Sequence, residues 1–170
     1  MIQLEVFNSL DRDDFVRVIG PVFEQSPWIA EAAWPRRPFA NVEDLHTALC
    51  EIVRSAGPEK QLALIRAHPD LVGRAALAGS LSAASTREQA SAGLGKLTAA
   101  EIARFRKQNR AYQEKFGFPF VICARENKKE AILAAFPLRL KNSRQREIET
   151  ALAQIAQIAQ LRLLDAVSER

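Results

Sequence analysis

Residues 98–119 have the sequence TAAEIARFRKQNRAYQEKFGFP, which contains both ends of one long predicted helix. Thr98 and Glu101 have the spacing of a capping box, in which each side chain binds the other residue's backbone N–H at a helix start. The side chains expected on the inner face are three and four residues apart, as in an α-helix: Ile102, Phe105, Asn109 and Tyr112. Gly117 and Pro119 end this predicted helix.

The same spacing of apolar residues recurs along nearly the whole chain. It predicts an all-α protein, a single compact domain of about eight helices over residues 1–170. Asn41 is expected to cap one helix, and Asn142 or Ser143 the last and longest one, whose apolar stripe runs through Val167. The sequence has no alternating βαβ pattern and no glycine-rich phosphate loop.

Two segments depart from the helical pattern. Residues 69–84 are rich in small side chains and predict a loop that contains one helical turn. Ser85 and Glu88 have capping-box spacing and predict a short helix to Gly93. Residues 118–123 resemble a strand, but the sequence offers no second strand to pair with, so we expect a buried extended segment.

The composition is ordinary for a soluble globular protein, with 48% apolar and 26% charged residues. The net charge is +4, and residues 125–146 alone carry seven basic side chains against two acidic ones, Glu126 and Glu130. Such a face attracts nucleic acid or a small anion, but a single charge run is more often a solvated helix surface, which is the interpretation favoured here.

Other classes of protein are excluded by what the sequence lacks. Cys50 and Cys123 do not make a disulfide scaffold and lack the close spacing of a structural zinc site. The charge-free stretches are too short to cross a bilayer, and residues 1–5 do not resemble a signal peptide. The last three residues are not a peroxisomal signal, so we expect a cytoplasmic protein with free thiols.

The two histidines lie in different sequence contexts. His46 falls in the middle of a predicted helix among polar neighbours, where a surface position explains it. His68 precedes Pro69, which ends a helix and favours an extended backbone at His68. An imidazole at a helix end beside a loop of small residues is a candidate general acid or base, although an interaction with the helix dipole is the competing explanation.

Three further residues are ambiguous from the pattern alone. Glu88 is either a helix cap or a site residue, and Gln89 next to it offers both a donor and an acceptor to a polar ligand. Arg162 is surrounded by apolar residues near the end of the last helix. It therefore needs an anionic partner, which is either a ligand or a carboxylate of the protein.

Seven blocks of the sequence match one known family in order: Phe23–Trp28, Arg37–Phe39, His68–Leu71, Ser85–Leu94, Asn109–Ala124, Arg139–Asn142 and Ile158–Leu163. On these blocks the sequence resembles the 2-oxo-4-hydroxy-4-carboxy-5-ureidoimidazoline (OHCU) decarboxylase family from about residue 7 to residue 167. That family acts in the degradation of urate to (S)-allantoin. Val72 is a departure, since alanine is usual in the family at this position.

The resemblance implies an all-helical, homodimeric and cofactor-free lyase with a small ureidoimidazoline substrate and no metal, nucleic-acid or membrane partner. It implies that His68 is catalytic, with Glu88 orienting it or sharing its proton. It further implies that the substrate is bound or bordered by the following residues: Pro69, Ser85, Glu88, Gln89, Phe120, Val121, Ile122 and Arg162.

Two other classes of function remain open at this point. A ureide hydrolase normally requires a metal site or a covalent nucleophile, and the sequence shows neither. A helical module that binds nucleic acid through residues 125–146 would bind in a salt-dependent way and would not need His68.

Overall fold

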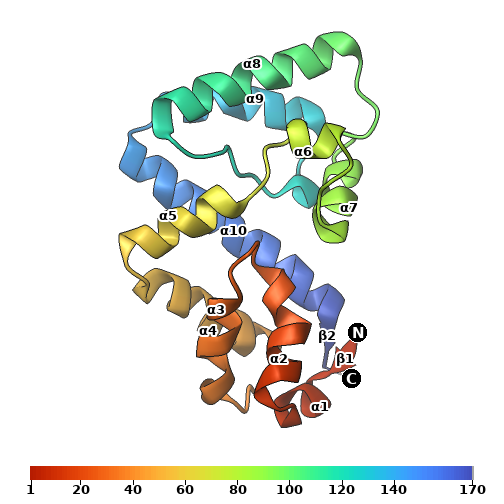
Figure 1. Cartoon of the computed structure of the whole chain (residues 1–170), viewed down its shortest axis with the longest axis vertical. Coiled ribbons are helices and arrows are strands. Elements are labelled where there is room, and N and C mark those ends of the chain that lie inside the picture. The colour runs from red at the N-terminus through yellow and green to blue at the C-terminus, as the bar shows by residue number, and fades with distance from the viewer. Residues whose placement is uncertain (170) are drawn as a thin grey trace. The chain divides into compact units, whose positions relative to one another are not determined.

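The computed structural model describes residues 1–169 apart from the side chain of Ala75; Arg170 lies outside the described residues. Ten α-helices and two very short strands lie within this part of the chain (Figure 1), so the all-α prediction is confirmed. The helices are α1 (Leu4–Ser9), α2 (Arg12–Ile19), α3 (Pro27–Ala33), α4 (Val42–Ser55), α5 (Pro58–Ala67), α6 (Arg74–Leu77), α7 (Ala83–Ser91), α8 (Ala99–Phe116), α9 (Lys129–Arg139) and α10 (Arg144–Ala166).

The helices outnumber the prediction of about eight for two reasons. Helix α1 precedes the first predicted helix, and the four-residue α6 is the helical turn expected within residues 69–84. Short 3₁₀ turns connect several elements: η1 (Gly20–Val22), η2 (Trp34–Arg36) and η3 (Ala124–Glu126). Within residues 1–169, no helix is both long and apolar enough to cross a membrane.

The chain divides into two compact units. Residues 1–67, together with the C-terminal part of the chain from Ala156, form the first unit. Residues 68–155 form the second. Helix α10 contributes to both, because its residues 144–155 belong to the second unit and the rest to the first.

Stacked phenylalanine rings form the core of the first unit. Phe7 of α1 stacks on Phe15 of α2 with ring centroids 4.6 Å apart, and Phe39 stacks on Phe15 at 6.4 Å. All three side chains are buried. Asn41 caps α4 as predicted, because its side-chain oxygen accepts a 2.7 Å hydrogen bond from the backbone N–H of Asp44.

The ends of the first unit pair with each other as a two-stranded parallel sheet. Strand β1 (Ile2–Gln3) pairs with β2 (Val167–Ser168), with Ile2 opposite Val167. The prediction that the last helix continues through Val167 is therefore wrong, since the helix ends at Ala166 and Val167 is buried in the strand. Strands of two residues are too short to show an alternation of apolar and polar residues, so no pattern in the sequence predicts them.

The second unit is organised around a buried carboxylate, Glu147 of α10, which has no exposed surface. Nε of Arg139 from α9 donates to it at 2.9 Å, and the Tyr112 hydroxyl from α8 donates to the same oxygen. Asn142 donates to its other oxygen at 2.7 Å. Burial and the hydrogen bond to Glu147 raise the pKa of Tyr112, which keeps its hydroxyl protonated.

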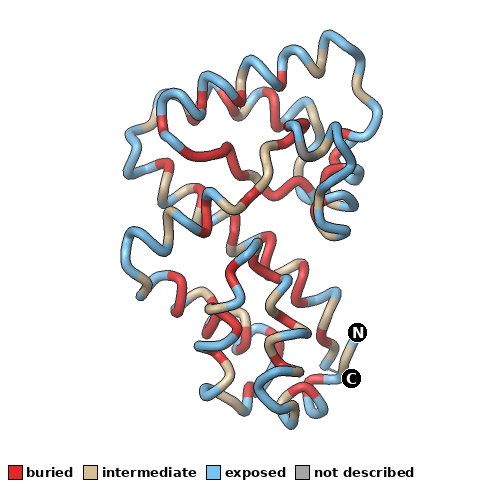
Figure 2. Tube along the Cα trace, in the orientation of Figure 1, coloured by how far each residue is buried: buried red, intermediate tan, exposed pale blue. Residues whose placement is uncertain are grey.

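The segment 118–123 is buried and extended, as predicted (Figure 2). Phe120 stacks on Phe136 with ring centroids 3.9 Å apart, and the Arg139 guanidinium lies over the Phe120 ring at 4.3 Å. Arg139 also donates to the Val121 carbonyl at 2.6 Å. The segment therefore satisfies its backbone through side chains rather than through a neighbouring strand.

The helix ends test the predicted caps directly. The Thr98–Glu101 capping box is present at the start of α8, and Gly117 ends that helix with a φ of 78°. Ser143 caps α10, because its hydroxyl accepts from the backbone N–H of Arg146 at 3.2 Å, whereas Asn142 serves Glu147 instead. Two of the three caps expected in this unit are therefore in place.

The predicted capping box of Ser85 and Glu88 is wrong. Helix α7 begins at Ala83, three residues earlier than a helix capped by Ser85 would begin. Ser82 caps it, because its hydroxyl accepts a hydrogen bond from the backbone N–H of Ser85 at 3.1 Å. Ser82 has an extended backbone with a ψ of 154°, which a cap residue requires. Glu88 is therefore inside the helix and does not serve as its cap.

We predict that Glu147→Ala lowers the free energy of unfolding by about 3–5 kcal/mol, because it leaves the Arg139 charge buried without its partner. Equilibrium unfolding in guanidinium chloride measures this change. Glu149→Ala is the matched control on the same helix, since Glu149 is exposed and its partners, Arg146 and Gln145, are exposed as well. The control is expected to change stability by less than about 0.5 kcal/mol, and an equal loss in both variants would contradict the role of Glu147.

Candidate active site

His68 lies directly after the last residue of α5, followed by Pro69, as the sequence predicts. Its side chain is buried, with the residue only 7% exposed, so it is not a surface histidine. The chain then makes a tight loop over residues 69–73 before α6 begins at Arg74. This placement is compatible with a proton-transfer role, because a buried imidazole beside a loop is shielded from bulk water.

Three side-chain amides from α7 and α8 hold the loop that follows His68. The Gln89 side-chain oxygen accepts from the backbone N–H of Val72 at 3.2 Å, and Asn109 donates to the Leu71 carbonyl at 2.7 Å. Gln113 donates to both carboxylate oxygens of Asp70 at 3.3 Å. Burial raises the pKa of Asp70, and the hydrogen bonds from Gln113 oppose that rise.

The loop contains a strained backbone at Val72, which has a φ of 54°. A β-branched residue in the left-handed region is uncommon, and such strain costs about 1–3 kcal/mol. At Gly73, an added Cβ would lie 2.6 Å from the Cβ of Asp70, so only glycine fits there. The amide side chains therefore fix a conformation that the chain would not adopt unaided.

The orientation of Asn109 shows that its donor is the group in use. Its side-chain oxygen is buried and has no hydrogen-bond partner among the described residues. An unsatisfied buried acceptor costs about 1–3 kcal/mol. An apolar side chain at this position would avoid the cost of the unsatisfied oxygen. The hydrogen bond that Asn109 donates to the Leu71 carbonyl offsets this cost and fixes the position of the loop at that carbonyl.

Helix α7 presents three of the expected site residues on one face, because Ser85, Glu88 and Gln89 are three and four residues apart. Ser85 and Gln89 are buried and Glu88 is half-buried. The Glu88 charge contributes to the raised pKa of Cys123, for which burial is the main cause, so its carboxylate lies near the end of the extended segment. Gln89 uses its oxygen on Val72 and retains two N–H donors on its amide nitrogen.

Phe120, Val121 and Ile122, the three residues of the extended segment expected to border the substrate, differ in which of their groups are already engaged within the protein. The Phe120 side chain is in the aromatic core, and the Val121 carbonyl is bound by Arg139. Ile122 is half-buried. This arrangement agrees with a role for the backbone of the segment rather than for the Phe120 ring. The second unit thus brings together the loop after His68, the inner face of α7 and this segment.

Arg162 lies in the first unit, where it is 7% exposed. It pairs with Glu24 at 2.9 Å and donates to the Val22 carbonyl at 3.3 Å. The sequence leaves open whether the anionic partner of Arg162 is a ligand or a carboxylate of the protein. In the structure, the carboxylate of Glu24 is one such partner. A role of Arg162 in substrate binding stays a prediction.

His46 is not the surface residue that the sequence analysis describes. Its side chain is 14% exposed, and Nε2 lies 2.9 Å from the Ala156 carbonyl, so this nitrogen carries the proton as a donor. The Cys50 sulfur lies 3.4 Å from the same nitrogen. Burial raises the pKa of Cys50, so this pair does not provide an activated thiolate.

Most of the basic side chains of residues 125–146 have partners within the second unit. Lys129 pairs with Glu101, Arg139 with Glu147 and Arg146 with Glu149. Lys128 and Arg144 donate to backbone carbonyls. These contacts favour the structural explanation of the charge run over a nucleic-acid surface. Among residues 1–169, no group of three or more His, Cys, Asp and Glu side chains is arranged to hold a metal ion.

Asn109 and Gln113 are the residues of this site that the sequence analysis missed as functional groups. Asn109 appears there only as one member of the inner face of a helix. The available signal was an amide at a position where the periodicity demands an apolar side chain, and a buried polar residue of this kind requires a specific partner.

Known proteins that resemble this chain agree on its family. A family model for OHCU decarboxylase matches residues 8–164. The chain is 44% identical to a 2-oxo-4-hydroxy-4-carboxy-5-ureidoimidazoline decarboxylase from Amia calva, over 94% of this chain and 91% of that protein. It is 42% identical to a protein of the same name from Haloferax volcanii, over 98% of this chain and 97% of the relative.

The fold is also found among solved structures. A crystal structure of (S)-allantoin synthase superposes with a TM-score of 0.78 at 27% identity, covering 99% of this chain and 54% of the other. The family model matches 157 of the 170 residues, and both decarboxylases are more than 40% identical over nearly the whole chain. The chain belongs to the OHCU decarboxylase family.

We predict that Asn109→Asp loosens the loop after His68, because a carboxylate oxygen would then face the Leu71 carbonyl in place of a donor. Amide hydrogen exchange at Val72 and Gly73 is expected to become at least about tenfold faster, equivalent to about 1.4 kcal/mol. Gln108→Glu makes the same chemical change one residue away and is the control. Exchange rates that rise equally in both variants would contradict the assignment.

Proposed function

We infer that this protein catalyses the decarboxylation of 2-oxo-4-hydroxy-4-carboxy-5-ureidoimidazoline to (S)-allantoin in urate degradation, as a carbon–carbon lyase. The observation that carries this inference is the family match over residues 8–164, which includes the loop of His68 and spans both compact units. For the same reason, we propose that residues 1–170 act as one decarboxylase domain.

The substrate itself contains the electron sink for the reaction. The carbon that loses carbon dioxide carries a hydroxyl and a carboxylate, and its ring neighbour is doubly bonded to nitrogen. When the bond to the carboxylate breaks, its electron pair moves toward this C=N group and leaves an enol-type intermediate. Delivery of a proton to one face of the ring then gives a single enantiomer. We therefore propose that the enzyme needs no cofactor for this step.

Residues of the second unit supply the acid and base groups in this proposal. His68 is proposed to exchange a proton with the substrate hydroxyl, since histidine is the side chain best suited to proton transfer near neutral pH. Glu88 is proposed to orient His68 or to share its proton. The free N–H donors of Gln89 suit the carbonyl oxygens of the ureido group or the ring.

The hydrogen bonds from Gln89, Asn109 and Gln113 to the loop, called the loop clamp below, support this assignment because they fix the chain immediately after His68. A proton-transfer group must lie within hydrogen-bond distance of the reacting atom, and small displacements reduce the rate strongly. Gln89 takes part in both tasks, since its oxygen holds Val72 and its nitrogen is available to the substrate. A homodimer and a cytoplasmic location, both implied by the family resemblance, are proposed along with the activity.

We predict that His68→Asn slows decarboxylation by roughly 10²–10⁴-fold, the usual contribution of a positioned proton-transfer group. Asparagine is similar in size and keeps some hydrogen bonds, but it does not act as an acid or base. The substrate is generated in situ from urate by upstream enzymes, and circular dichroism follows the appearance of (S)-allantoin above its spontaneous formation. Substrate binding is expected to survive better than turnover.

His46→Asn is the matched control for His68→Asn. It removes the other histidine and its hydrogen bond to the Ala156 carbonyl in the first unit. Activity per folded molecule is expected to stay near that of the unmodified protein, with folding checked by far-ultraviolet circular dichroism. If folded His68→Asn makes (S)-allantoin at the unmodified rate, the histidine is structural and the mechanism is wrong.

We predict that Arg162→Lys lowers kcat/KM at least about tenfold, which corresponds to about 1.4 kcal/mol. Lysine keeps the charge that faces Glu24 but loses the planar fork that binds a carboxylate or carbonyl in a bidentate way. The kinetics are compared with the melting temperature of the same variant. Unchanged efficiency with a lower melting temperature would show that Arg162 serves only the ion pair with Glu24.

A further inference from the structure

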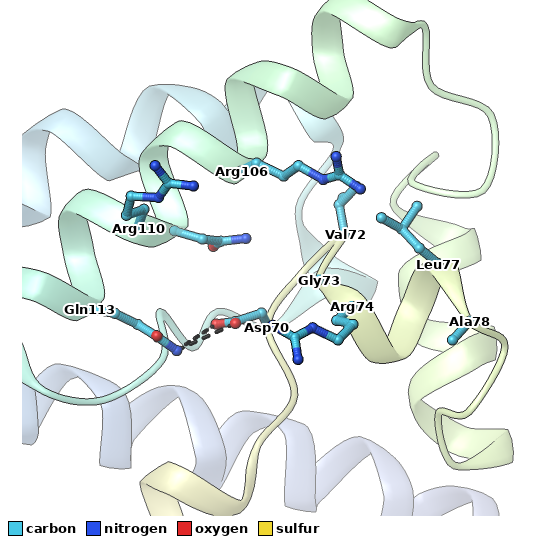
Figure 3. A pocket seen from close by; sticks show the side chains of 10 residues that line it. Asp70, Val72, Gly73, Arg74, Leu77, Ala78, Arg106, Arg110 and Gln113 are labelled. Carbon is cyan, nitrogen blue, oxygen red and sulfur yellow. Dashed lines mark hydrogen bonds between the residues drawn. The ribbon is translucent and has the colours of Figure 1, made fainter.

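An open pocket of about 840 Å³ lies in the second unit, between residues 70–78 and one face of α8 (Figure 3). Arg106 and Arg110 extend toward it from α8, while Arg74 lies on its other side near Asp70. His68, Ser85, Glu88 and Gln89 do not line it. The pocket is therefore separate from the residues to which the decarboxylation is assigned.

Three of the five arginines of the second unit whose guanidinium groups have no ion-pair or hydrogen-bond partner among the described residues line this pocket; the other two are Arg87 and Arg104. By contrast, six other arginines pair with carboxylates: Arg12, Arg17, Arg36, Arg139, Arg146 and Arg162. Unpaired positive charge that converges on a concave surface attracts anions.

The spacing of the arginines strengthens this argument. Arg106 and Arg110 are four residues apart on α8, so two like charges are neighbours on one helix face, which disfavours the helix. An anion between them removes that repulsion. Asp70 is the one carboxylate of the pocket, and it is already bound by Gln113 (Figure 3).

The size of the pocket indicates the kind of anion. Its volume falls in the range of pockets that hold small organic ligands, about 300–1,000 Å³, and exceeds what one inorganic ion needs. Each guanidinium presents a fork of donors that matches a carboxylate or a phosphate. Three such groups around one cavity suit a ligand with more than one acidic group.

We propose that this pocket is a second ligand site, which binds a small organic anion carrying two or more carboxylate or phosphate groups. Asp70, Val72 and Gly73 line it and belong to the loop that follows His68. A ligand bound there contacts the loop on the side of α8. It therefore stabilises the strained conformation at Val72 and slows hydrogen exchange at the Gly73 amide.

The experiment is isothermal titration calorimetry of the full chain with citrate and with pyrophosphate, at constant ionic strength. Saturable binding of either anion is expected, and the tighter of the two identifies carboxylates or phosphates as the preferred groups. The double variant Arg106→Gln with Arg110→Gln is expected to bind at least tenfold more weakly. Arg104→Gln is the matched control, since Arg104 is exposed on the same helix and does not line the pocket; its affinity is expected to change less than twofold.

Three results would overturn the proposal. One is the absence of saturable binding for both anions, with the variants shown by circular dichroism to be folded. Another is an equal loss of affinity in Arg104→Gln, which would indicate general attraction to a basic helix. The third is competition between the anion and the ureidoimidazoline substrate, or loss of anion binding in His68→Asn, which would make the pocket part of the catalytic site. Failure of decarboxylation itself would leave the calorimetric result unaffected.

Discussion

The carboxylate of Glu147 is the group on which the second unit depends. It has no exposed surface, and it receives hydrogen bonds from α8, from α9 and from the turn that precedes its own helix. A buried charge of this kind is costly unless every neighbouring donor is in place. Three helices must therefore approach it together, which makes its burial a condition for assembling this part of the chain.

Arg139 connects the Glu147 network to the extended segment of residues 118–123, which borders the proposed site. The same guanidinium that neutralises Glu147 also binds the Val121 carbonyl and covers the Phe120 ring. The extended segment has no strand partner, so Arg139 replaces part of a ladder of backbone hydrogen bonds. The segment then ends at Cys123, near the carboxylate of Glu88. A structural ion pair thus determines where one wall of the proposed site lies.

The sequence predicts the helices well because their signals are local. The Thr98 box, the Asn41 cap and the apolar spacing each involve residues within a few positions of one another. The position of His68 was likewise visible, because Pro69 acts on its immediate neighbour. The error at Ser85 has the same origin, since two serines three residues apart both satisfy the rule for a cap, and only packing selects Ser82.

What the sequence does not reveal is contact between distant residues. Asn109 meets Leu71 across 38 positions, and Glu147 meets Tyr112 across 35. No spacing rule connects such pairs, so the loop clamp and the buried carboxylate appear only in three dimensions. The family resemblance named the residues around His68 but assigned no role to Asn109 or Gln113. The strained Val72, which departs from the usual alanine, is explained only by the hydrogen bonds that hold it.

The pairing of β1 with β2 has a practical consequence for engineering. Ile2 and Val167 are direct neighbours across the sheet, so the two ends of this chain leave the first unit at one place (Figure 1). Chains with adjacent ends tolerate circular permutation when the new opening falls in an exposed loop. A short linker would therefore connect the residues beside Ile2 and Ser168, and a reporter fused next to either strand would lie beside the same two-stranded sheet of the first unit.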